Sequence, residues 1–174
     1  NIFTYGLSVA LEHRDTTGGH AILKRGDVQV MSAGTGLEHS EINPSDTEPV
    51  HLLQIWIEPD RMGHAPRHAE KRFDDNAKRN RLTVIAAPDG SGIDGALPIH
   101  QDARIMASIL DANRMLTHDL APGRAVFLHL VSGALDVNGT ALAPGDAAAI
   151  TAESPLRITA GETSEFLLFD LPGA

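Results

Sequence analysis

The chain has 174 residues, of which 42% are hydrophobic, and this length and composition are typical of a soluble globular protein with one ordinary domain or two small ones. Its 14 basic and 23 acidic residues give a net charge of −9, which argues against direct nucleic-acid binding because phosphate contacts need a basic patch. The absence of cysteine excludes disulfides, thiolate ligands and thiol nucleophiles, and no apolar run approaches the roughly 18 residues that span a membrane. We therefore expect a cytoplasmic protein without membrane contacts.

The sequence opens inside a predicted strand. Residue 1 is asparagine instead of methionine, and residues 2–5 (Ile-Phe-Thr-Tyr) already have the β-branched and aromatic composition of a strand. Native chains rarely begin in mid-strand. We therefore expect further residues to precede Asn1 in the natural protein.

Short strand-like segments follow one another through the first half of the chain. Turns rich in Gly, Asp, Asn and Pro separate them, and Pro59 ends the last one because proline cannot donate to a β-ladder. From Glu58 to about Gln101 proline and glycine punctuate a polar stretch, which predicts a connector interrupted by one strand at 82–86. The strands predicted before this connector are 2–5, 7–13, 20–23, 28–31, 37–42 and 50–57.

Strand signals resume in the second half of the chain, and helix signals are poor throughout. Many short strands at this spacing indicate an all-β sandwich or barrel. The strands predicted here are 103–110, 115–120, 125–131, 134–137, 147–151, 156–159 and 165–171.

The two halves also share an internal repeat. An Ala-Leu-acid strand after a small-residue turn, a Gly-Asp turn and an apolar strand ended by proline recur in the same order. We therefore predict two tandem β-barrel domains. The first covers residues 1–95, is incomplete at its N-terminus and includes the connector from about residue 59; the second covers 96–174. The second copy has Ser-Pro-Leu-Arg-Ile-Thr at 154–159 where the first has His-Ser-Glu at 39–41, so we expect it to hold no site.

The candidate site lies in residues 26–43. A Gly-Asp turn, a short apolar strand and a loop containing Gly34 and Gly36 lead to His39 and Glu41. Side chains two residues apart in an extended segment point the same way, so His39 and Glu41 share one face. Glycines allow close backbone approach, and an imidazole beside a carboxylate forms half of a metal site. Taken alone, this spacing favours an ordinary hydrogen-bonded strand histidine over a metal site.

The other histidines are expected to be structural. His51 lies on a strand whose two faces are both largely apolar, and we predict a satisfied core residue. His13 and His20 flank a polar turn and are expected to be solvated. His64 and His68 have the i, i+4 spacing of two ligands on one helix turn, but the proline between them disfavours a helix. No carboxylate stands at ligand spacing from the remaining three, His100, His118 and His129.

These segments resemble the pirin family of the cupin superfamily over nearly the whole chain. The most specific piece is Met-Ser-Ala-Gly-Thr-Gly at 31–36 followed by His-Ser-Glu at 39–41. The second cupin motif fits at Gly26, Gly34, His39 and Asn43, with Ser32 in place of proline and a loop two residues longer. Further matching segments are 11–15, 54–59, 71–73, 99–102 and 167–172.

The resemblance implies a bicupin, in which two jelly-roll-like β-barrels stack and the N-terminal barrel holds one divalent metal. Iron is the usual metal, while manganese, nickel, copper and zinc suit the same ligands. The family uses three His and one Glu. Two of these match His39 and Glu41, and the family pattern places the other two upstream of Asn1. The segment 5–9 (Tyr-Gly-Leu-Ser-Val) departs from the family's usual Tyr-Val-Leu-Glu-Gly.

The resemblance also implies an enzyme similar to bacterial quercetinases. These flavonol (quercetin) 2,3-dioxygenases open a small aromatic substrate with O2, and Glu41 would then be both a metal ligand and the catalytic base. One alternative is a non-enzymatic, metal-responsive scaffold that binds a protein partner, as described for transcriptional co-regulators of the family. The other is an inactive truncated form with an exposed sheet edge. We expect a monomer.

Overall fold

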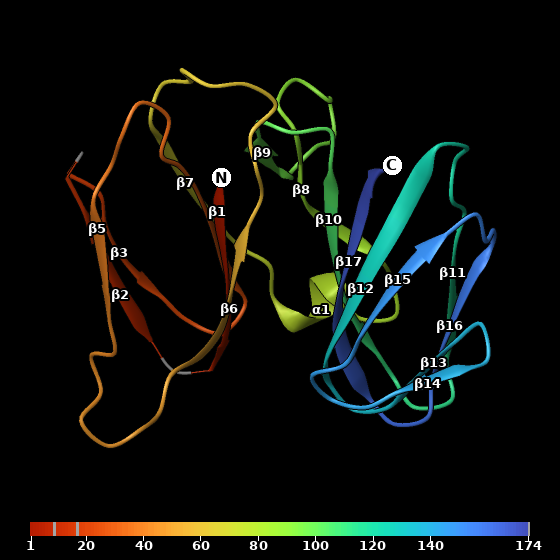
Figure 1. The fold of residues 1–174 in the computed structure, drawn as a ribbon. Helices are drawn as coiled ribbons and strands as arrows, with labels where there is room; N and C mark the ends of the chain where they lie inside the picture. Colours follow the sequence, from red (N-terminus) through yellow and green to blue (C-terminus); the bar gives the residue numbers. More distant parts are fainter. Residues whose placement is uncertain (9, 17, 174) are drawn as a thin grey trace. The chain divides into compact units, whose positions relative to one another are not determined.

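The computed structural model describes residues 1–8, 10–16 and 18–173, which divide into two compact units. Unit 1 comprises Asn1–Asp74 and Pro88–Gln101, and unit 2 comprises Asp75–Ala87 and Asp102–Ala174. Strands predominate in both units, which confirms the predicted all-β fold (Figure 1). Val9, in the strand predicted at 7–13, and Thr17, in the polar turn after it, lie outside the described residues.

Unit 1 contains two antiparallel sheets, with strand orders β6-β1-β4-β7 and β3-β2-β5. Their strands run from red to yellow in Figure 1. The bounds are β1 (Ile2–Ser8), β2 (Leu11–Asp15), β3 (His20–Leu23), β4 (Asp27–Ser32), β5 (His39–Ile42), β6 (His51–Trp56) and β7 (Arg67–Arg72), with β9 (Leu97–Ile99) later in the chain.

Unit 2 contains a sheet that runs β15-β12-β17-β10-β8 and a second sheet of order β11-β16-β13-β14. Its helix, α1 (Asp75–Lys78), has four residues, and no helix among the described residues has the length and apolar character needed to cross a membrane. The strand bounds are β8 (Thr83–Pro88), β10 (Arg104–Leu110), β11 (Met115–His118), β12 (Arg124–Ser132), β13 (Leu135–Val137), β14 (Thr140–Leu142), β15 (Ala147–Thr151), β16 (Leu156–Ala160) and β17 (Ser164–Pro172).

Aliphatic and aromatic side chains form a hydrophobic core in unit 2. Leu128 on β12 lies directly opposite Leu168 on β17, and both are fully buried. Leu130 and Phe166, two residues further along each strand, also lie opposite each other and are buried. Because inward and outward positions alternate on a strand, these pairs place a continuous apolar layer between the two sheets.

Unit 1 has a polar face in its interior. On the central strand β1, Thr4 lies opposite both Gln29 on β4 and Gln54 on β6, and Thr4 and Gln29 are only 2% exposed. The other face of β1 carries Phe3 and Tyr5, which are fully buried. Both faces of this strand are therefore covered, one with hydrocarbon and one with groups that need hydrogen-bond partners.

The structure corrects the predicted strands at several places. The stretch 58–101 holds three strands, β7, β8 and β9, where the sequence predicted one. The unpredicted β7 pairs with β4 along its full length, although residues 70–72 (Glu-Lys-Arg) are exposed. Edge strands tolerate such charged residues, so the pattern lacks the apolar alternation of a half-buried strand. The strands predicted at 20–23 and 147–151 are confirmed to the residue.

Candidate metal centre

The two candidate ligands come from β5, an edge strand of the β3-β2-β5 sheet. His39 and Glu41 are partly buried while Ser40 and Ile42 between and beside them are exposed, so the pair shares the inward face. Glu41 lies opposite His13 in the register with β2. The alternation of an extended strand thus brings an imidazole and a carboxylate together on one side.

His13 is a residue whose environment the sequence analysis predicted wrongly. It was expected to be solvated and is instead 0% exposed. Its Nε2 lies 3.2 Å from Asp15 Oδ2, while its Nδ1 lies 4.0 Å from Glu41 Oε1 and has no hydrogen-bond partner. β2 is the central strand of its sheet, and His13 is on its inner face. Its place beside a polar turn suggested solvent exposure, because polar side chains near turns are usually exposed.

A row of imidazole rings crosses the interior of unit 1. The ring centroid of His13 is 5.6 Å from that of His39 and 5.4 Å from that of His68, with interplanar angles of 24° and 12°. His68 on β7 forms a side-chain hydrogen bond with Gln29 on β4. Residues on four strands (β2, β4, β5 and β7) therefore supply one polar cluster, and the predicted absence of a helix at 64–68 is confirmed.

A hydrogen-bonded chain on β6 reaches Glu41 from the other sheet. Trp56 Nε1 donates to Gln54 Oε1 at 3.3 Å, and Gln54 Nε2 donates to Glu41 Oε2 at 2.9 Å. Sequence pattern had left open which face of this strand lines a pocket, and these contacts show that the face carrying the exposed residues Gln54 and Trp56 is the one that meets Glu41. His51, predicted to be a core residue, is exposed because it begins β6 at the edge of the sheet.

The donor types in this cluster fit a divalent metal, but only in part. His39 and Glu41 are the imidazole and carboxylate that such metals bind, and the buried unpaired Nδ1 of His13 shows that the site is polar without being saturated. Within residues 1–8, 10–16 and 18–173, no group of three or more His, Asp or Glu side chains is arranged to hold a metal ion. The pair can therefore serve as two ligands of a metal that needs others to complete its coordination.

A cavity of about 1020 Å³ opens beside His39 in unit 1. Apolar side chains contribute much of its lining, among them Met31, Leu37, Trp56 and Met62. The Trp56 side chain is 74% exposed, so its ring is accessible. Cavities of this size and character hold small organic molecules, and aromatic side chains favour flat aromatic ones.

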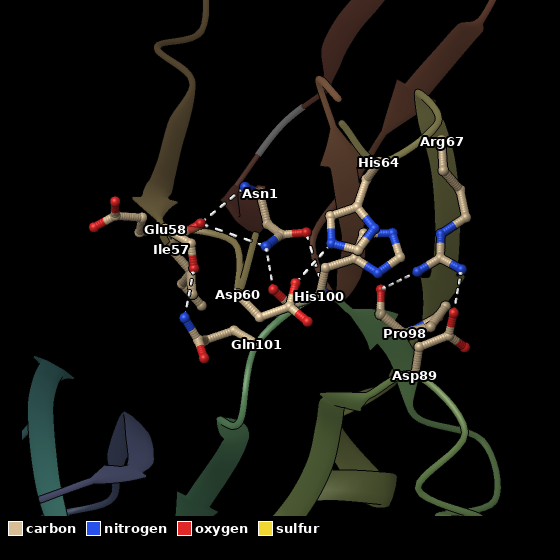
Figure 2. A network of polar contacts seen from close by, with 10 residues as sticks. All are labelled: Asn1, Ile57, Glu58, Asp60, His64, Arg67, Asp89, Pro98, His100 and Gln101. Carbon is tan, nitrogen blue, oxygen red and sulfur yellow. Dashed lines mark hydrogen bonds and ion pairs between the residues drawn. The ribbon is translucent and has the colours of Figure 1, made fainter. Parts of the chain in front are cut away.

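A network of polar contacts holds one wall of this cavity (Figure 2). The backbone N–H of Ile57 donates to the carbonyl oxygen of Asn1 at 2.9 Å, and the side-chain amide of Asn1 donates to the carbonyl oxygen of His100. The imidazole of His64 stacks on that of His100 with centroids 3.7 Å apart, and its Nε2 lies 2.6 Å from Asp60 Oδ1. These contacts fix the segment that follows β6.

The same network shifts the pKa values of its members. The hydrogen bond from His64 lowers the pKa of Asp60. Burial lowers the pKa of His100, and the nearby charge of Arg67 lowers it further. Arg67 also donates to Asp89 at 2.9 Å and lowers the pKa of that carboxyl group. The lowered pKa of His100 therefore favours its uncharged form, and its ring lies stacked on that of His64 with centroids 3.7 Å apart.

An all-β chain with a half-buried His/Glu pair on the inner face of a sheet has the architecture of a cupin. Residues 1–57 match the family described as Pirin, and residues 84–171 match the family described as Quercetinase C-terminal cupin domain. A quercetin 2,3-dioxygenase of Escherichia coli K12 is 41% identical over 171 residues, which cover 98% of this chain and 72% of the relative. A putative quercetin 2,3-dioxygenase of Pasteurella multocida is 44% identical over 172 residues, with the same coverage. The chain belongs to the pirin family.

Solved structures agree with this assignment. YhhW from E. coli superimposes with a TM-score of 0.92 at 39% identity, covering 99% of this chain and 72% of that one. A second structure of this bacterial pirin, in complex with nickel(II), gives a TM-score of 0.91. The predicted pirin family and the all-β, cupin-like fold class are confirmed.

Proposed function

We propose that this protein is a metal-dependent dioxygenase that opens the ring of a flavonol-like substrate with O2. The observation that carries the proposal is the His39/Glu41 pair on one strand face, beside a largely apolar cavity of about 1020 Å³. The names of the E. coli and P. multocida relatives support the substrate class. In the overall reaction, one flavonol and one O2 would give one ring-opened ester and one carbon monoxide, so both atoms of O2 enter the products.

His39 and Glu41 would bind one divalent metal, and further ligands, two histidines by the family pattern, would complete the set. Iron is our first candidate, and manganese, nickel, copper and zinc accept the same ligands. The nickel(II) complex of YhhW supports a divalent ion of this group. A bound metal with open positions supplies Lewis-acid polarisation and a place for O2 or a substrate oxygen.

The protein's own side chains would bind the substrate and move its proton. A carboxylate oxygen of Glu41 would accept the proton of the flavonol hydroxyl, as a general base must lie within hydrogen-bond reach of it. The ring of Trp56 would stack on the aromatic substrate, and the apolar lining would exclude water. His39 at the cavity edge would orient the reacting end of the substrate toward Glu41.

The test combines metal content with turnover. Elemental mass spectrometry of the purified protein should find about one metal per chain, and quercetin absorbance should fall only when metal is present. His39→Ala should lose the metal, and Glu41→Gln should lose turnover. His20→Ala is the control, because His20 is exposed and its contact is with Glu12, outside the site. Metal-loaded protein that leaves quercetin intact would refute the proposal.

The second candidate function is a metal-responsive scaffold that binds a protein partner. It is favoured by one observation, the lack of a three-ligand cluster among the residues that the structure describes. In this case the bare chain would bind metal weakly, and its partner would be recovered from lysate in only one metal state. Equal recovery with and without metal would contradict it.

A further inference from the structure

We propose that Gln54 is a positioning residue that orients the Glu41 carboxylate, and that Trp56 sets the orientation of Gln54. The inference deepens the proposed function, because Glu41 is its candidate ligand and base. It rests on two hydrogen bonds in series: Trp56 to Gln54 at 3.3 Å and Gln54 to Glu41 at 2.9 Å. Neither Gln54 nor Trp56 was a candidate site residue in the sequence.

The direction of this chain follows from what each group can donate. The indole N–H of Trp56 is a donor only, so the oxygen of the Gln54 amide must face it. The amide nitrogen of Gln54 then necessarily points away from Trp56 and toward Glu41. An ionised carboxylate is an acceptor only, so Glu41 matches the group that it meets. With the opposite amide orientation, N–H would face N–H at Trp56 and oxygen would face oxygen at Glu41.

The geometry of the strands allows this chain because Gln54 and Trp56 are two residues apart on β6. Side chains at i and i+2 lie on one face of a strand, and here that face meets Glu41 on β5 of the other sheet. Gln54 engages Oε2 of Glu41, while Oε1 faces the imidazole of His13 at 4.0 Å. The carboxylate therefore has a fixed partner on one oxygen and a neighbour on the other.

The position of Trp56 extends this role to the substrate cavity. Trp56 lines the cavity with His39, and its ring is accessible. A flat aromatic molecule stacked on Trp56 would thus contact the residue that orients Gln54. Occupancy of the cavity and the orientation of Glu41 would be linked through two hydrogen bonds.

Nuclear magnetic resonance of the metal-free protein tests the chain of hydrogen bonds directly. Trp56 is the one tryptophan of the sequence, so the spectrum contains one indole N–H signal. Gln54→Leu should move this signal upfield because it removes the acceptor, and Glu41→Leu should move it by a smaller amount. Gln101→Leu is the matched control, since the Gln101 amide bonds to the Glu58 carbonyl instead. An indole signal unchanged by Gln54→Leu would overturn the proposal.

Metal affinity tests the positioning role, with nickel(II) as the probe in competition with a chromogenic chelator. Loss of a residue that orients a ligand typically weakens metal binding about 10–100-fold, and we expect this for Gln54→Leu. Trp56→Phe, which keeps the ring but removes the N–H, should weaken binding less. The double variant should bind no more weakly than Gln54→Leu alone, because Trp56 acts through Gln54. Additive losses, or an equal loss in Gln101→Leu, would overturn the positioning role.

The two measurements separate this inference from the proposed function. If the wild-type chain binds no nickel or leaves quercetin intact, the proposed function fails, and the indole signal still decides whether Gln54 links Trp56 to Glu41. If metal binds and quercetin is consumed while Gln54→Leu changes neither the signal nor the affinity, the proposed function stands and this inference is wrong.

Discussion

The glycine loop before His39 provides a sharp test of how the site is built. Gly34 has φ +54°, and a Cβ added to it would lie 2.2 Å from the carbonyl oxygen of His64. The same Cβ would lie 2.8 Å from the nitrogen of Pro66 and 2.9 Å from the carbonyl carbon of Ala65. All three atoms belong to the backbone of a neighbouring segment. Gly34→Ala therefore forces one of two main-chain segments to move.

Gly63→Ala is the matched control for this substitution. Gly63 also has a positive φ, +80°, but nothing lies within 4 Å of its added Cβ. Both variants incur the left-handed backbone strain of a non-glycine residue, about 1–2 kcal/mol. Only Gly34→Ala adds an overpacking cost of about 1–3 kcal/mol. We expect losses of about 2–5 kcal/mol for Gly34→Ala and about 1–2 kcal/mol for Gly63→Ala.

Urea unfolding followed by Trp56 fluorescence measures these losses in unit 1, which contains the one tryptophan of the chain. The linear dependence of free energy on urea gives the difference between each variant and the wild type. Gly34→Ala should also weaken nickel binding, because the loop leads directly to His39. Equal losses in the two variants would show that the segments do not approach each other as described.

Three further predictions concern burial and charge. Lys78 is 0% exposed and lies 3.4 Å from Glu165, so Lys78→Met should cost about 3–5 kcal/mol by removing the buried cation beside that carboxylate, and adding Glu165→Leu should restore most of the loss in thermal unfolding. Leu168→Ala should destabilise unit 2 by about 2–5 kcal/mol in the same assay, since Leu168 is fully buried. Burial and the charge of Arg67 lower the pKa of His100, so the unfolded chain takes up its proton first and the stability of unit 1 should fall as the pH drops below 6.5. His100→Phe should flatten that dependence in urea titrations, and an unchanged slope would contradict it.

Sequence pattern predicted strands well wherever one face of a sheet meets an apolar core. The strand at 147–151 was predicted to the residue, and β12 and β17 differ from prediction by one residue at each end. The inward positions of β12 are Val126, Leu128 and Leu130, so its period of two is visible in the letters, whereas β17 is recognisable from the unbroken apolar run at 166–169. Helix content was also predicted correctly, because the segments lack the 3.6-residue period.

The strand β7 could not be predicted from its own residues. Its sequence, Arg-His-Ala-Glu-Lys-Arg, contains neither an apolar alternation nor the β-branched residues of typical strands. It becomes a strand because β4 offers an unpaired edge, with which it pairs from Asp27 opposite Arg72 to Ser32 opposite Arg67. The two paired segments are far apart in the sequence, so no short sequence window around β7 could predict that it forms a strand.

The candidate site was half predicted. The spacing of His39 and Glu41, strengthened by the family motif, indicated a shared face. The contribution of His13 was missed because it flanks a polar turn, where side chains are usually solvated, and that of Gln54 because both faces of its strand are largely apolar and the pattern did not distinguish them. The signal that could have found Gln54 is its alternation with Leu53 and Ile55 on the same strand, which puts it on the face with Trp56 that meets Glu41.

The two units share a repeat of turns and strands, but the side chains in their interiors differ in kind. Leu128 and Leu168 face each other in unit 2, whereas Thr4 and Gln29 face each other in unit 1. Buried polar groups are costly unless they are hydrogen-bonded, so the interior of unit 1 must be organised by specific partners such as the Gln29–His68 contact. An apolar core tolerates exchange among side chains of similar volume, but a polar one does not. Hydrogen bonds are directional, whereas apolar packing depends mainly on side-chain volume. The hydrogen-bonded interior of unit 1 can therefore hold a carboxylate in a defined orientation.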